Sequence, residues 1–100
     1  MRVLGIDTSN YTTSIALVDE DGFRQERRLL SVGKGERGLR QCSALFLHTV
    51  NLPEIIRALA PMEKLDAVAY SAYPRDVAGS YMPCFLAGQA AAQTAASVLN

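Results

Sequence analysis

The sequence has few cysteines and no excess of charge of either sign, and both shortages exclude classes of function. Cys42 and Cys84 are its two cysteines in 100 residues, and they show neither CxxC nor Cys/His spacing, so the sequence indicates no disulfide framework. We expect both to be small buried hydrophobic residues of a protein from a reducing compartment. Ten Lys and Arg balance ten Asp and Glu, and the formal net charge of zero argues against nucleic-acid binding by overall electrostatic attraction.

Membrane-spanning and leader segments are also missing from the pattern. Met1 and Arg2 lead directly into an apolar run that ends in an acid, and the least polar stretch, 82–99, contains proline, glycine and glutamines. We therefore expect a cytoplasmic protein without a membrane partner. With 49% apolar residues in 100, the chain suffices for one small globular domain with a marginal core.

What is present is a strand, a polar turn and a second strand over 2–18. Val3, Leu4 and Ile6 form an apolar run typical of a central strand covered on both faces. The run ends at Asp7, the short polar side chains of 8–10 favour a turn, and 12–18 resumes a strand. Hydroxyl and turn N–H groups can donate to phosphate oxygens while Asp7 holds a cation or its water, which predicts a cradle for metal-bound phosphate. The alternative is an ordinary turn in which Asp7 caps local N–H groups.

The pattern of the remaining chain predicts the order β-β-β-α-β-α. Asp21-Gly22 is a hairpin signal, and the arginines of the following strand, 23–30, suit a sheet edge. Helical spacing covers 39–59, and Pro53 is expected to kink or break that helix near 49–52. A strand over 65–71 should then lie parallel to the first, followed by a turn at 73–76 on the side where α/β sheets bind ligands.

A last helix, rich in small residues, is predicted from Tyr81 to about Val98, with Ser80 as its N-cap and Pro83 in its first turn. The order is that of an α/β, ribonuclease-H-like lobe, but the sheet is incomplete, because such a sheet needs a fifth strand. We therefore expect the chain to be the first part of a longer protein. As a hypothesis, the isolated chain self-associates through the unfinished sheet edge and the last helix.

Two further features have competing interpretations. The glycine-rich loop 31–38 does not match the Walker spacing, so Lys34 either approaches a ligand or RNA, or simply lies in a solvated connector. His48 and Asn51 lie three apart on the predicted helix and can share one face. A lone His beside an Asn is not a metal site, and local hydrogen bonding is the expected role.

The run Gly5 to Ser14 resembles the first phosphate-binding hairpin of the actin, sugar-kinase and Hsp70 superfamily. More narrowly, Met1 to Val18 resembles the start of the glycoprotease family, once called O-sialoglycoprotein endopeptidases and now understood as the subunit that makes N6-threonylcarbamoyladenosine in tRNA. The resemblance continues through the Leu45–Leu59 helix with its internal proline, through 65–70, and through Gly79 into the small-residue helix, so it covers most of the chain.

The resemblance implies an actin-type ATPase lobe that pairs with a second lobe around a nucleotide, ATP or an acyl-adenylate. The nucleotide contacts would be Asp7, Thr8, Ser9, Asn10 and Thr12. The family's metal-binding HxxxH segment follows the last helix seen here, so the parent protein can hold a divalent metal and this chain supplies no metal ligands. Implied partners are the second lobe, a homo-dimer or a paralogous subunit, and tRNA for the parent.

The first turn departs from the family pattern. Members typically carry Glu-Thr-Ser-Cys-Asp-Glu-Thr, whereas this chain has Tyr11 in place of the Asp and Thr12 in place of the Glu. Tyr11 is thus the candidate at the catalytic position, and a phenol is a poorer base than a carboxylate at neutral pH. A later Gly-Pro-Gly loop keeps only Pro74. These departures indicate a divergent paralogue and argue against the standard transfer chemistry. The alternatives are a non-catalytic scaffold subunit and a fragment of another kinase of the superfamily.

Overall fold

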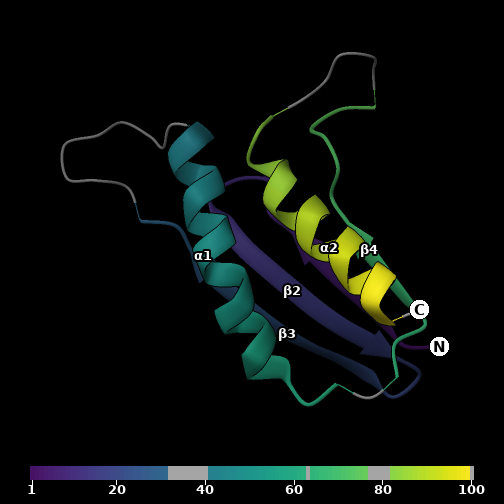
Figure 1. The fold of residues 1–100 in the computed structure, drawn as a ribbon. Coiled ribbons are helices and arrows are strands. Elements are labelled where there is room, and N and C mark those ends of the chain that lie inside the picture. The colour runs from purple at the N-terminus through teal and green to yellow at the C-terminus, as the bar shows by residue number, and fades with distance from the viewer. Residues whose placement is uncertain (32–40, 63, 77–81, 100) are drawn as a thin grey trace.

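The computed structural model describes residues 1–31, 41–62, 64–76 and 82–99, and it contains the predicted element order (Figure 1). The elements are β1 (Val3–Asp7), β2 (Thr12–Asp19), β3 (Gly22–Leu29), α1 (Gln41–Leu59), β4 (Ala67–Tyr70) and α2 (Phe85–Leu99). The described strands form one sheet in the order β3-β2-β1-β4, in which β4 runs parallel to β1 and the other pairs are antiparallel. The predicted mixed α/β architecture and parallel fourth strand are therefore confirmed.

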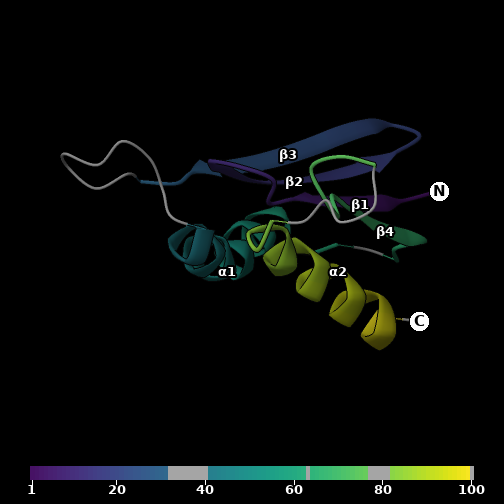
Figure 2. The ribbon, with the colours of Figure 1, turned by 90° about the horizontal axis from the view of Figure 1, so that it is seen from above.

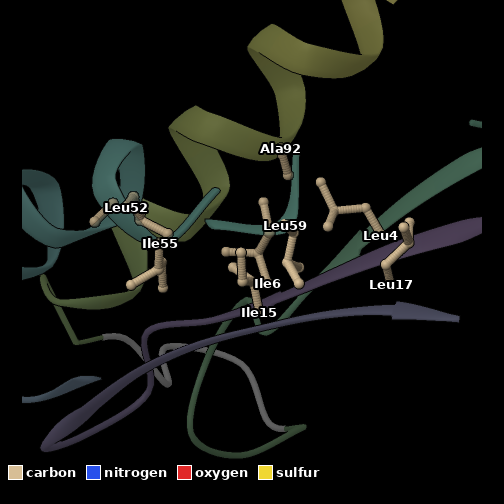
Figure 3. Close-up of a cluster of buried hydrophobic side chains, with 9 residues drawn as sticks. Leu4, Ile6, Ile15, Leu17, Leu52, Ile55, Leu59 and Ala92 are labelled. Atoms are coloured by element: carbon tan, nitrogen blue, oxygen red, sulfur yellow. The ribbon is translucent and has the colours of Figure 1, made fainter. Parts of the chain in front are cut away.

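Both helices lie on the same side of the sheet, and together with it they make two layers (Figure 2). Alternation along β1 and β2 directs every second side chain toward the helices. The core between the layers joins these strand residues to three residues of α1 and two of α2 (Figure 3): Leu4, Ile6, Ile15, Leu17, Leu52, Ile55, Leu59, Ala87 and Ala92. Burying each large aliphatic side chain contributes about 1.5–3 kcal/mol, so this cluster is what holds the sheet and helices together.

The opposite side of the sheet is called the open face below. Val3, Gly5, Ser14 and Ala16 lie there with part of their surface accessible, and no described helix covers them. The expectation that β1 is covered on both faces is therefore not met by the described residues. A continuous apolar run cannot by itself tell one covered face from two, because glycine and valine are tolerated on either.

The hairpin between β2 and β3 is the one that Asp-Gly predicts. Gly22 has a φ of +135°, a conformation that side chains with a Cβ rarely adopt. β3 is the edge strand, as its arginines predicted, and all but one of its residues are exposed.

Helix α1 differs from its prediction, because it continues through Pro53 as a single helix. The predicted break near 49–52 is therefore wrong, and the kink, the other form of that expectation, stays a prediction. Proline removes one backbone hydrogen bond, but the side chains on either side of it, Leu52 and Ile55, are buried against the sheet. This tertiary packing favours an uninterrupted helix despite the proline, and the Thr49 hydroxyl donates to the Leu45 carbonyl oxygen at 2.7 Å.

Helix α2 begins later than predicted, at Phe85, so Pro83 lies in the turn before the helix and not in its first turn. In that turn the N–H of Phe85 donates to the Met82 carbonyl and that of Leu86 to the Pro83 carbonyl. The predicted packing role of its small residues is confirmed, since Ala87, Gly88 and Ala92 are buried. The predicted N-cap Ser80 and the 32–38 part of the glycine-rich loop, with Lys34, lie outside the described residues, as does the side chain of Cys42.

Candidate functional site

The predicted phosphate-binding turn lies at the end of β1 and is open to solvent. β1 and β4 are parallel and end at the same edge of the sheet, with the N–H of Ser71 donating to the Ile6 carbonyl at 3.1 Å. Asp7, Asn10 and Tyr11 are exposed, and Ser9 is half-buried. The turn is therefore accessible to a ligand at the carboxyl ends of two parallel strands, where α/β sheets usually bind one.

Asp7 accepts two hydrogen bonds on its Oδ1 atom. The backbone N–H of Ser9 donates at 2.9 Å, and the hydroxyl of Ser71, just beyond β4, donates at 2.8 Å. Partial burial alone would raise the pKa of Asp7, but the bonds from Ser9 and Ser71 outweigh it and hold the pKa below its usual value. The local capping role of Asp7 is thus real. The carboxylate is nevertheless ionised and exposed to solvent, so it can still bind a cation.

A buried histidine fixes the backbone of the turn from the helix side. His48 of α1 is fully buried, and its Nε2 lies 2.9 Å from the Asn10 carbonyl oxygen. Because a carbonyl only accepts, Nε2 carries the ring proton and Nδ1 accepts from the Thr13 hydroxyl at 2.7 Å. The Thr13 oxygen in turn accepts from Asn51 Nδ2 at 3.2 Å. This chain of three bonds confirms the predicted shared face of His48 and Asn51 and their hydrogen-bonding role.

The environment keeps His48 neutral. Burial lowers its pKa below the ordinary 6.5, and it outweighs the hydrogen bond to Asn10 and the negative charge of Asp7, which both raise it. On the strand side, the N–H of Leu30 donates to the Tyr11 carbonyl at 2.6 Å. The backbone of the turn is therefore held from both sides, while the side chains of Asn10 and Tyr11 are exposed and accessible to a ligand.

Thr8 faces the other way. Its side chain is fully buried, and its hydroxyl donates to the Cys84 carbonyl at 2.9 Å and accepts from the Gly88 N–H at 3.1 Å. The Cys84 carbonyl and the Gly88 N–H are four residues apart, which is the spacing of a backbone hydrogen bond in an α-helix. By bonding both groups, the Thr8 hydroxyl fixes the start of α2 against the end of β1. A Cβ on Gly88 would lie 3.0 Å from that oxygen, which explains the glycine. The Thr8 side chain therefore has a structural role. A contact between Thr8 and a nucleotide stays a prediction, and only its backbone could make that contact.

A hollow of about 420 Å³ lies over the turn and the open face. Its size is within the range of small-molecule sites. Five of the six residues predicted from the sequence line it, namely Asp7, Ser9, Asn10, Tyr11 and Thr12. The sequence analysis missed three further lining residues, Ser14 of β2 with Gln25 and Arg27 of β3, and also missed Ser71, the hydroxyl donor to Asp7. Only the strand register could have found them, because they are distant in the sequence.

Among the residues that the structure describes, one carboxylate lines the hollow, that of Asp7. No group of three or more His, Cys, Asp or Glu side chains is placed to hold a metal ion among the described residues. One carboxylate is nevertheless what a magnesium ion needs from a protein when phosphate oxygens and water complete its shell. Asp7 therefore fits a cation that arrives with a phosphate ligand. Neither described helix is long and apolar enough to cross a membrane.

Comparison with known proteins gives matches among solved structures only, since no protein-family model and no curated protein matches the sequence. YeaZ from Pseudomonas aeruginosa superimposes with a TM-score of 0.69 at 21% sequence identity, over 98% of this chain and 39% of that one. A second structure, of an uncharacterised protein with similarity to peptidase YeaZ from Pseudomonas aeruginosa, gives 0.69 at 19% identity over the same shares. The chain thus spans about two fifths of the length of these structures.

At 19–21% sequence identity the comparison shows a similarity of fold. The superposition covers 98% of the chain, and so nearly all of the four described strands and the two helices. The resemblance predicted from the opening hairpin is therefore confirmed as a structural one: the chain has the fold of the corresponding part of YeaZ.

Proposed function

We propose that this chain is a nucleotide-phosphate-binding lobe of a glycoprotease-like protein related to the tRNA threonylcarbamoyladenosine system. The observation that carries the proposal is the turn at the end of β1. Its carboxylate is kept ionised by Ser9 and Ser71, its backbone is held by His48 and Leu30, and its polar side chains line an open hollow of about 420 Å³. Polar groups that are already held in place favour the binding of a charged ligand, because little conformational entropy is lost when the ligand binds.

In this proposal the hydroxyl and amide groups of Ser9, Asn10 and Thr12 donate to phosphate oxygens. Asp7 repels a phosphate by itself, so it acts through a divalent cation that accompanies the nucleotide. The proposed ligand is accordingly a magnesium nucleotide, ATP or an acyl-adenylate, and the nucleoside itself would meet the second lobe of the parent protein.

The test is a nucleotide titration with and without magnesium, comparing wild type with Asp7→Asn. Wild type should bind ATP more tightly with magnesium than with EDTA. The Asn variant should lose that dependence and bind in EDTA at least as well as wild type, because a repulsive charge is gone. Asp21→Asn is the matched control, since Asp21 is an exposed acid in the β2–β3 hairpin at the far end of β2. Equal magnesium dependence in wild type and Asp7→Asn removes Asp7 from the site.

A second candidate is a non-catalytic partner subunit that assembles through this lobe. It is favoured by Tyr11, which is 42% exposed beside the hollow and stands where the family has a carboxylate. Such a subunit needs a surface for its partner, and the open face presents Phe23 and Leu29, each at least 70% exposed. Sedimentation velocity at micromolar concentration should then show a dimer of the chain, and a strict monomer at every concentration counts against this candidate.

A further inference from the structure

A row of four polar side chains crosses the open face at the edge where the candidate site lies. The strand register places Asp7 beside Ser14 and Ser14 beside Arg27, so the row runs through β1, β2 and β3. On its other side Asp7 accepts the hydroxyl of Ser71, which extends the row beyond β4. Asp7, Ser14 and Arg27 all line the 420 Å³ hollow, so the three side chains face the same space.

The two charged residues of the row, Asp7 and Arg27, have Ser14 between them. Neighbouring strands are about 4.8 Å apart, so the backbones of Asp7 and Arg27 are separated by about 10 Å with Ser14 between them. The hydrogen bonds and ion pairs of the described residues include none to the guanidinium of Arg27. Its neighbour Arg28 points to the helix side, where it forms an ion pair with Glu54 of α1. Arg27 is therefore the arginine of β3 whose charge is directed into the candidate site.

The ordinary interpretation is that Arg27 only protects the sheet edge. Edge strands carry basic residues against pairing with other chains, and β3 has three arginines for that purpose. Edge protection does not require a polar hollow next to the arginine, nor a row of hydroxyl and carboxylate groups leading to it. Those two features are what a phosphate ligand requires, because a guanidinium presents paired N–H donors that match phosphate oxygens.

We propose that Arg27 is the anion-binding residue of the site and contacts the phosphate oxygens of the nucleotide, at the end of the hollow opposite to Asp7. The proposal rests on the proposed function and adds a specificity to it. Asp7 selects a cation-bound phosphate, and Arg27 selects a ligand with a further negative group a few ångströms away. A nucleoside diphosphate or triphosphate has such a group, whereas an uncharged nucleoside lacks it.

The test compares Arg27→Gln with Arg24→Gln in titrations with magnesium ATP and with magnesium triphosphate. Both variants remove one positive charge from the same strand, but Arg24 lies opposite Leu17 in the register, on the helix side of the sheet. Arg27→Gln should weaken binding of both probes about tenfold or more, since charged hydrogen bonds to the ligand are lost. Arg24→Gln should stay within about twofold of wild type, because screening by salt leaves little of a distant charge.

The outcomes separate this inference from the proposed function. If wild type binds neither probe, the proposed function fails and the inference with it. If wild type binds, Asp7→Asn loses its magnesium dependence and Arg27→Gln matches Arg24→Gln, the site stands and the role of Arg27 is refuted. A loss with ATP but not with triphosphate also refutes it, because the contact would then be to the nucleoside. Arg27→Lys keeps the charge without the paired donors and should fall between wild type and Arg27→Gln.

Discussion

Replacing Thr13 by Val tests whether the buried hydrogen-bond chain holds the site together. The substitution keeps the shape of the side chain and deletes one hydroxyl, which donates to His48 Nδ1 at 2.7 Å and accepts from Asn51 Nδ2 at 3.2 Å. Both partners are buried, so water cannot replace the lost bonds.

The expected loss follows from the two bonds. A buried acceptor left without a donor costs about 1–3 kcal/mol, and the amide of Asn51 loses about 0.5–1.5 kcal/mol more. Thr13→Val should therefore lower the free energy of unfolding by about 1.5–4.5 kcal/mol, a large share of the about 5–15 kcal/mol typical of a domain. The substitution should weaken mainly the contact between α1 and the turn, because His48 loses its bond to Thr13 and is the residue that bonds the Asn10 carbonyl of the turn.

Urea unfolding followed by circular dichroism measures this difference. Thr12→Val is the matched control: it is the same chemical change one residue earlier, on the other side of β2, and no described group bonds its hydroxyl. The control should unfold within about 0.5 kcal/mol of wild type, as surface substitutions usually do. Equal midpoints for the two variants would refute the idea that the His48–Thr13–Asn51 chain stabilises the fold.

Two further predictions concern the same layer of the molecule. His48 has a folded-state pKa below 6.5. As the pH falls through 6.5, His48 becomes protonated in the unfolded chain but not yet in the folded one. The free energy of unfolding therefore decreases until the pH reaches the pKa of His48 in the folded state. His48→Gln removes the single histidine of the chain and should abolish the part of the slope that sets in as the pH falls through 6.5, and identical slopes in urea titrations would contradict this assignment. Gly88→Ala places a Cβ 3.0 Å from Thr8 Oγ1 and 3.3 Å from Ile6 Cγ2. The overpacking penalty of about 1–3 kcal/mol should exceed the gain in helix propensity of about 1 kcal/mol, so the melting temperature should fall, and a rise would show that α2 can shift freely.

The sequence alone determined the elements and their order, because the signals for them are local. An apolar run ending at Asp7, an Asp-Gly turn and a helical spacing ending at Leu59 each depend on neighbours within a few residues. The candidate turn was found for the same reason. Its residues Ser9, Asn10 and Tyr11 come just after a strand end, and polar turn residues after such a strand are visible in the sequence.

Tertiary structure decided what those local signals leave open. The direction of Thr8 depends on where α2 docks, and the continuity of α1 at Pro53 depends on burial of its neighbours, so neither can be read from a short window. The partners Ser14, Arg27 and Ser71 joined Asp7 only through strand pairing, in which residues distant in the chain become adjacent. Local pattern therefore specified the parts of this lobe, and the register between strands specified its site, because side chains on a sheet meet by their position across strands and not along them.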